Sequence, residues 1–304
     1  MRKILFILII TASAFNTYAC DICGCGGGNF YMGLLPNFKN KFIGLRYHYV
    51  QFYTRLANDA SQFSHNYYNS IELWGGWNIG NKWQVLAFVP YYYNKQADDD
   101  GTSYKSGLGD ITLMLNYQLL HTRSMNKNGK SVEQVLWFGG GIKLPSGTFK
   151  VNPNDSTTTL ADINAQIGTG STDFLLNALY NVRIGFFGVN TSVNYKIGTT
   201  NSSDYKFGNK FTTNSIAYYR FRTAKGTTIA PNAGLMYEHT DINLLNNEKV
   251  QYTGSHAFSA LAGVEVTFNK ISVGISAQTP LVQNFAENQT KMQLRGLAHI
   301  TFAL

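Results

Sequence analysis

The chain has 304 residues and a formal net charge of +8 at pH 7, and 14% of its residues are charged. Soluble domains typically carry about a quarter charged residues, so the composition disfavours an ordinary soluble enzyme. The 44% hydrophobic residues exclude a disordered chain, and the basic residues form no cluster that would indicate nucleic-acid binding. The 29 glycines, 19 tyrosines and 20 phenylalanines favour many strands joined by glycine-containing turns.

The N-terminus has the features of a secretory signal peptide. Arg2 and Lys3 precede an apolar stretch, and Thr17 and Ala19 supply small residues at the positions that signal peptidase recognises. The apolar stretch is shorter than the roughly 20 residues that a membrane-spanning helix needs, and no later stretch is longer. The predicted parts of the chain are a signal peptide at 1–19, a periplasmic segment rich in cysteine and glycine at 20–40, and one outer-membrane barrel domain at 41–304.

All three cysteines lie in the C-D-I-C-G-C segment at 20–25, for which three interpretations stay open. Cys20 could carry a lipid as the first mature residue, although Thr17 stands where a lipobox usually has leucine. Cys20, Cys23 and Cys25 could bind Cu or Zn through thiolates, although a fourth ligand is missing. Two of them could instead form a disulfide in the oxidising periplasm. No histidine follows the C-x-x-C pair, which argues against haem attachment.

From residue 41 onward, apolar and polar residues alternate with a period of two, which predicts strands with one apolar face. In 255–268, for example, Phe258 lies on the apolar face and Glu265 on the polar one. Near the C-terminus, the same pattern predicts Met292 on the apolar face and Lys291 on the polar face. Further alternating segments are 110–118 and 173–183.

The pattern predicts twelve strands, an even number, as bacterial outer-membrane barrels have. Connections after even-numbered strands are short turns, apart from 122–131, whereas those after odd-numbered strands are long and polar, including 95–106 and 146–170. Such asymmetry is typical of transmembrane barrels, and a closed sheet satisfies every backbone group in hydrocarbon. The predicted fold class is all-β, an antiparallel transmembrane β-barrel. The predicted strands are 41–54, 66–79, 82–94, 107–121, 132–145, 171–184, 186–198, 208–222, 227–240, 253–268, 270–280 and 289–303.

If the apolar face meets lipid, the polar face lines the lumen and carries charges of both signs. Buried charges need partners, so part of this set should form ion pairs that brace the barrel. Twelve strands imply a narrow pore, because eight are filled by side chains and sixteen leave an aqueous channel. The residues predicted to line the lumen or contact a solute are Arg46, Glu72, Asp110, Lys143, Asp173, Arg183, Glu265 and Arg295, with Lys196, Lys291 and Glu238 on the same face.

Aromatic residues near strand ends are predicted to form interface girdles. His48 and His299 fall on the polar face without a nucleophile and base at a catalytic spacing, so an enzyme is not predicted. The girdle candidates are Trp74, Trp77, Trp83, Tyr91, Tyr92, Tyr93 and Trp137.

Three short motifs stand at the loop-side ends of consecutive predicted strands: S-G-L-G-D at 106–110, G-I-K-L-P-S-G at 141–147 and Q-I-G-T-G-S-T-D at 166–173. In order and spacing they resemble the motifs of an outer-membrane transporter family named for phenol meta-cleavage pathways. The resemblance covers residues 40–304 and implies a transport role. The motifs place charged residues where they could ring a mouth, and their glycines are expected to serve bulges and turns.

The sequence therefore predicts a Gram-negative outer-membrane, porin-like β-barrel that passes a small solute by passive or facilitated diffusion. Its expected partners are the lipid bilayer and that solute, with no nucleic acid and no cofactor unless the cysteines bind Cu or Zn. The alternative is a barrel scaffold whose cysteine segment binds a soft metal or a periplasmic partner. An open lumen favours the first function, and a lumen sealed by charges and residues 26–38 favours the second.

Overall fold

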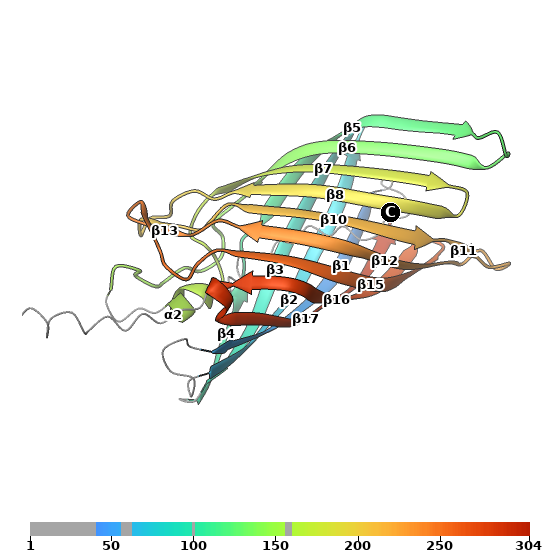
Figure 1. Cartoon of the computed structure of the whole chain (residues 1–304). Coiled ribbons are helices and arrows are strands. Elements are labelled where there is room, and N and C mark those ends of the chain that lie inside the picture. The colour runs from blue at the N-terminus through green and yellow to red at the C-terminus, as the bar shows by residue number, and fades with distance from the viewer. Residues whose placement is uncertain (1–40, 56–62, 99–100, 156–159) are drawn as a thin grey trace, which may run out of the picture.

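A computed structural model describes residues 41–55, 63–98, 101–155 and 160–304. Within these residues, twelve long antiparallel strands form one closed sheet, each pairing with the next along the barrel (Figure 1). They are β1 (Phe42–Arg55), β2 (Phe63–Ile79), β3 (Trp83–Asp98), β5 (Thr112–Met125), β6 (Ser131–Lys143), β7 (Asp173–Ile184), β8 (Phe187–Ile197), β10 (Lys210–Tyr219), β12 (Thr228–Thr240), β15 (Ser255–Phe268), β16 (Ile271–Phe285) and β17 (Thr290–Ala303).

Shorter elements extend the barrel at its two ends. α2 and β13 lie at the end of the barrel that has the long loops, and β11 lies at the other end (Figure 1). The strands β9, β13 and β14 pair with one another in a small separate sheet. The shorter elements are β4 (Gly101–Leu108), α2 (Leu160–Asn164), β9 (Tyr205–Lys206), β11 (Phe221–Arg222), β13 (Leu244–Leu245), β14 (Glu248–Lys249) and the 3-10 turn η1 (Ala286–Asn288).

The first and last strands close the barrel. β1 pairs with β17 from Phe42 opposite Ala303 to Thr54 opposite Thr290, and the Leu304 amide donates to the Lys41 carbonyl oxygen at 2.8 Å. No long strand of the described chain is therefore left with an unpaired edge, as a sheet in hydrocarbon requires. The predicted closed all-β barrel is confirmed. No helix among the described residues is long and apolar enough to cross a bilayer.

Alternation along the strands separates an apolar outer face from a largely polar interior. On β1, Ile43 and Leu45 point outward and are 45% and 48% exposed, whereas Phe42 and Arg46 are buried. Buried polar and charged side chains outnumber buried apolar ones in the described chain. The predicted assignment of the apolar face to the outside holds for most strands, because the period of two follows directly from backbone geometry.

A β-bulge overturns the prediction for two residues of β17. Gln51 of β1 lies opposite Leu294, but Phe52 lies opposite Met292, so Gln293 is an extra residue. One inserted residue exchanges the two faces of the strand beyond it. Met292 is consequently 1% exposed and packs inside with Phe52, while Lys291 faces outward. Alternation in the sequence does not reveal such an insertion.

The predicted strand 107–121 is divided in the structure. β4 pairs with Tyr91–Asp98 of β3, and β5 pairs with Trp83–Phe88 of the same strand. At the break, the Gly109 amide donates to the Pro90 carbonyl oxygen at 2.8 Å, and a Cβ on Gly109 would lie 2.2 Å from the Tyr92 ring. The predicted loop 95–106 is therefore mostly a hairpin, and the link 122–131 shortens to a turn between β5 and β6.

The aromatic residues divide between the two faces. Trp77, Trp83, Tyr91 and Tyr93 are 44–54% exposed on the outer face, in agreement with the predicted girdles. The girdle prediction is wrong for the remaining three. Trp74 and Trp137 are at most 3% exposed and pack inside the barrel, and Tyr92 lines an internal cavity.

An arginine on the outer face should destabilise the barrel according to its depth. Leu73 lies on β2 between the outward residues Tyr67 and Trp77, whereas Ile79 ends β2 at the turn. We expect Leu73→Arg to cost about 2–4 kcal/mol and Ile79→Arg about 0–1 kcal/mol, because water and headgroups solvate a charge near the interface. Denaturant unfolding in liposomes measures both values. Equal costs for the two variants would contradict the membrane position of this face.

Candidate functional site

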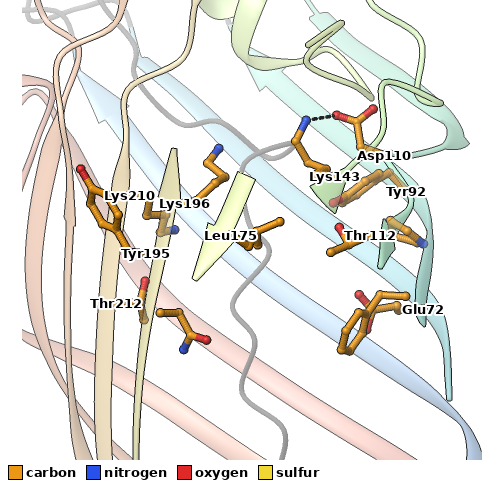
Figure 2. A pocket seen from close by; sticks show the side chains of 13 residues that line it. Glu72, Tyr92, Asp110, Thr112, Lys143, Leu175, Tyr195, Lys196, Lys210 and Thr212 are labelled. Carbon is orange, nitrogen blue, oxygen red and sulfur yellow. Dashed lines mark hydrogen bonds and ion pairs between the residues drawn. The ribbon is translucent and has the colours of Figure 1, made fainter. Parts of the chain in front are cut away.

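A cavity crosses the lumen near the end of the barrel that carries the long loops. It is lined from seven strands, between Glu72 on β2 and Lys210 on β10. β2 and β10 are separated by five strands in either direction around the ring, so they face each other across the barrel. Figure 2 shows Lys196, Lys210 and Thr212 on one side of this cavity and Glu72, Tyr92 and Asp110 on the other.

Asp110 holds the loop between β6 and β7 against the cavity wall. Its Oδ2 accepts a hydrogen bond from Lys143 Nζ at 2.6 Å (Figure 2) and another from the Thr169 amide at 3.0 Å. Its Oδ1 accepts a hydrogen bond from the Gly147 amide at 2.9 Å. Asp110 is 6% exposed and Thr169 is fully buried, so each of these bonds is shielded from water. A single carboxylate thus ties two ends of the loop to the start of β5.

Asp173 completes the same network from the first position of β7. Lys143 Nζ lies 3.1 Å from Asp173 Oδ2, and Lys196 Nζ lies 3.7 Å from the same oxygen. Asp173 Oδ1 accepts a hydrogen bond from Ser171 Oγ at 2.8 Å and from the Thr199 amide at 3.2 Å. The three sequence motifs therefore meet in one structure: Asp110 from the first, Lys143 from the second and Asp173 from the third.

Two glycines let the loop pack against itself beside this network. A Cβ on Gly147 would lie 2.8 Å from the Gly168 Cα, and a Cβ on Gly168 would lie 2.6 Å from the Gly147 carbonyl oxygen. The Gly168 amide donates to the Thr148 carbonyl oxygen at 3.0 Å. The close approach explains why both motifs contain glycine at these positions. It also agrees with the expectation that the motif glycines serve the backbone.

An apolar cluster outside this network joins three of the long loops. Ile163 of α2, Tyr205 of β9 and Phe207 are all at most 3% exposed and pack together. Phe149 and Leu245 pack against them from the loops that follow β6 and β12. These contacts join loops that are distant in sequence into one packed structure.

Other predicted lumen charges form ion pairs that cross between strands. Arg46 donates from Nε to Glu72 Oε1 at 2.7 Å, and its guanidinium lies 4.4 Å from the centroid of the Trp74 ring. Arg295 of β17 lies 3.0 Å from Glu238 of β12, although β15 and β16 stand between these strands. The predicted bracing of the barrel by inward ion pairs is thus found for Arg46, Glu72 and Arg295.

Two further predicted residues have their contacts elsewhere in the barrel. Arg183 is near the short-turn end and pairs with Glu133 on the adjacent strand at 2.5 Å. Glu265 is buried and lies 4.0 Å from His299. The structure therefore gathers Asp110, Lys143 and Asp173 into one network and leaves these two in separate surroundings. A solute-contacting role for any of them stays a prediction.

The period of two could have identified further cavity residues. Lys210, Thr212 and Asn194 line the cavity and occupy inward positions of β8 and β10. Lys196 was predicted on the inner face and does line the cavity. Thr169 and Ser171 had no such signal, since they lie in the irregular part of a loop and their roles come from tertiary contacts.

The cysteine segment lies outside the described residues, so the metal, lipid and disulfide interpretations of Cys20, Cys23 and Cys25 stay predictions. The predicted signal peptide and the segment 20–40 lie outside them as well. Within 41–55, 63–98, 101–155 and 160–304, no group of three or more His, Cys, Asp or Glu side chains is arranged to hold a metal ion.

No family model matches the chain, and no curated protein matches its sequence. The crystal structure of an outer membrane channel from Pseudomonas putida F1 is 14% identical over 87% of this chain and 96% of that one, with a TM-score of 0.60. The beta domain of the Bordetella autotransporter BrkA is 12% identical over 87% and 100%, with a TM-score of 0.47. The NanC porin is 12% identical over 86% and 100%, with a TM-score of 0.43.

The chain has the fold of an outer-membrane channel barrel. The similarity to the Pseudomonas structure covers nearly all of both barrels and confirms the predicted fold class. The fold is consistent with the predicted outer-membrane localisation. Membership of the phenol meta-cleavage family stays a prediction, because no family model matches.

Removing the charge of Asp110 should release the loop. We expect Asp110→Asn to destabilise the protein by about 1.5–3 kcal/mol, because it removes the charge from buried hydrogen bonds while Lys143 keeps Asp173 as a partner. Protease cleavage within 144–172 should become faster, which gel analysis of timed digests measures. Asp241→Asn is the matched control, since Asp241 is about half exposed and its side chain pairs with His239. An Asp110→Asn protein as resistant as the wild type would refute this role.

A methyl group at Gly168 should disturb the same loop without changing charge. We expect Gly168→Ala to cost about 1–3 kcal/mol, because its Cβ would meet the backbone of Gly147. Gly140→Ala is the control, since the nearest atom to its Cβ would lie 3.4 Å away. Denaturant unfolding of the two variants checks the expectation. Equal stability of the two variants would show that the two ends of the loop can move apart without loss of stability.

Proposed function

We propose that this barrel is an outer-membrane channel that lets small solutes cross by passive or facilitated diffusion. The observation that carries the proposal is the cavity that spans the lumen from β2 to β10. A barrel that served only as a scaffold would have no need of an internal space lined by polar and charged side chains. The fold shared with an outer-membrane channel supports the same function.

The interior supports a narrow passage for small solutes. A second cavity is lined by His48, Met236 and Arg295 among others. Glu238 connects the two cavities, because it pairs with Arg295 of the second and lies 4.0 Å from Lys210 of the first. We infer that solutes passing between these spaces move past the pair of Glu238 and Arg295. Charged constrictions of this kind select by size and charge in channels.

Apolar side chains line another part of the interior. Trp74, Phe88 and Trp137 are at most 3% exposed and belong to one inward cluster, and Phe88 also lines the first cavity. A passage with charged groups on one wall and aromatic rings on another suits solutes that combine an apolar body with a polar group. The resemblance of the three motifs to a transporter family supports transport of such a solute.

Current through the purified mature protein in planar bilayers tests the proposed function. We expect discrete current steps in potassium chloride, and uptake of small solutes but not of oligosaccharides into liposomes that contain the protein. Heat-modifiable gel migration of the same sample establishes that the barrel is folded. Folded protein that gives neither current nor uptake would refute the channel.

Removing the ion pair between the cavities should widen the passage. We expect the double variant Glu238→Ala with Arg295→Ala to raise single-channel conductance by about twofold or more, because both side chains leave the lumen and no charge of the pair remains alone. Glu133→Ala with Arg183→Ala is the control, since this pair joins adjacent strands near the short turns. The same conductance in both double variants would contradict a constriction at Glu238.

A further inference from the structure

Two hydrogen-bond donors in the second cavity have no partner among the described residues. Gln278 of β16 lies opposite Arg295 of β17 in the register, and both side chains line this cavity. Gln278 is 8% exposed, and its buried Nε2 forms no hydrogen bond with the described residues. The same holds for the buried Nε of Arg295. Buried donors in proteins are nearly always bonded, so these two indicate an acceptor that comes from outside the chain.

Other hydrogen bonds hold these two side chains in place. Arg295 donates from Nη1 to Glu238 Oε2 at 3.1 Å and from Nη2 to Glu238 Oε1 at 3.0 Å. Arg295 Nη1 also donates to Gln278 Oε1 at 3.3 Å, which places the amide beside the guanidinium. The donors left over are therefore the Nε–H of Arg295 and the amino group of Gln278. Because both planar groups are already fixed, a ligand at these donors would bind to a preorganised site.

The charge of Arg295 is compensated within the protein. Glu238 is 3% exposed, and both of its carboxylate oxygens accept from the guanidinium. An anionic solute at the remaining donors would bring a second negative charge close to this buried carboxylate, and repulsion between charges is strong where water is scarce. A cationic solute would meet the guanidinium and would offer no acceptor. The arrangement therefore favours the oxygen of an uncharged group.

Apolar side chains line the cavity beside these donors. Met236 and Leu261 belong to one inward cluster and are 4% and 8% exposed. Both line the cavity, together with Leu297 of β17. Water could satisfy the two donors but would leave this apolar surface hydrated, whereas a compact organic molecule covers it. The cavity thus suits a solute that has an acceptor at one end and an apolar body.

We propose that Gln278 and Arg295 bind the carbonyl oxygen of a small uncharged organic solute, such as a ketone, an ester or an amide. The inference rests on the proposed channel function and names the class of solute. A carbonyl oxygen has two lone pairs, so it can accept from Gln278 Nε2 and from Arg295 Nε at once. The body of the solute then contacts Met236 and Leu261. Because Arg295 also belongs to the ion pair between the two cavities, the solute binds beside the constriction.

Block of the channel current by cyclopentanone tests the subsite. Cyclopentylammonium and cyclopentanecarboxylate carry the same ring with a positive or a negative charge. In planar bilayers with potassium chloride, we expect cyclopentanone to lower the wild-type current at concentrations at which neither charged probe does. Stronger block by the carboxylate than by the ketone would overturn the assignment to an uncharged solute.

Two variants remove one donor each. Gln278→Met should need about fivefold more cyclopentanone for the same block, because a thioether donates no hydrogen bond. Arg295→Lys keeps a positive charge beside Glu238 but lacks Nε, and the same loss is expected. Gln283→Met is the matched control and should respond as the wild type. Gln283 lies on the same strand, and its side chain bonds to the backbone of Met292.

The temperature of heat-modifiable unfolding gives a second readout that needs no current. A ligand that binds only the folded protein raises this temperature. We therefore expect cyclopentanone to raise it more in the wild type and in Gln283→Met than in Gln278→Met. The same gels establish that each variant is folded.

The outcomes separate the subsite from the channel. Current in every protein, with the same response to cyclopentanone in Gln278→Met as in the wild type, would overturn the subsite and leave the channel intact. Folded protein without current, whose unfolding temperature still rises with cyclopentanone in the wild type and not in Gln278→Met, would overturn the channel and retain the binding site. The absence of both effects in folded wild-type protein would overturn both.

Discussion

Every backbone polar group inside a hydrocarbon layer must find its partner within the protein, and the rest of this structure depends on that requirement. The pairing of β1 with β17 meets it by closing the sheet. Closure then divides each strand into outward and inward residues, so that Ile43 and Leu45 face outward while Arg46 faces the interior. Because the interior is narrow, inward charges are brought within reach of one another, and ion pairs become part of the architecture.

The loops obey the same electrostatic rule as the strands. Lys143 ends β6 inside the barrel, where an unpaired ammonium would be costly, and Asp110 and Asp173 from flanking strands surround it. The hydrogen-bonding capacity left on Asp110 is used by the Gly147 and Thr169 amides, so the charge network also positions the loop between β6 and β7. The cluster of Asp110, Lys143 and Asp173 therefore positions the cavity wall and the loop that borders the cavity.

The sequence alone predicts the features that arise from the alternation of apolar and polar residues along the strands. The closed fold, the boundaries of most strands and the inward direction of Asp110, Lys143 and Arg295 follow from local alternation and turn residues. Features that depend on one extra residue or on contacts between distant segments do not follow. The bulge at Gln293 reverses Met292 and Lys291, and the approach of Gly147 to Gly168 depends on how the loop folds back. Whether two charges that share a face will touch is likewise a matter of tertiary geometry.

The cavity departs from the rule that the remainder of the interior follows. Arg46 with Glu72, Arg295 with Glu238 and Lys143 with two aspartates all place opposite charges in close contact. Lys196 and Lys210 instead place like charges opposite each other, beside the Asn194 amide, whose Nδ2 has no hydrogen-bond partner among the described residues. A cross-strand ion pair stabilises a sheet where a like-charged pair does not. Departures from local consistency of this kind are expected at functional sites.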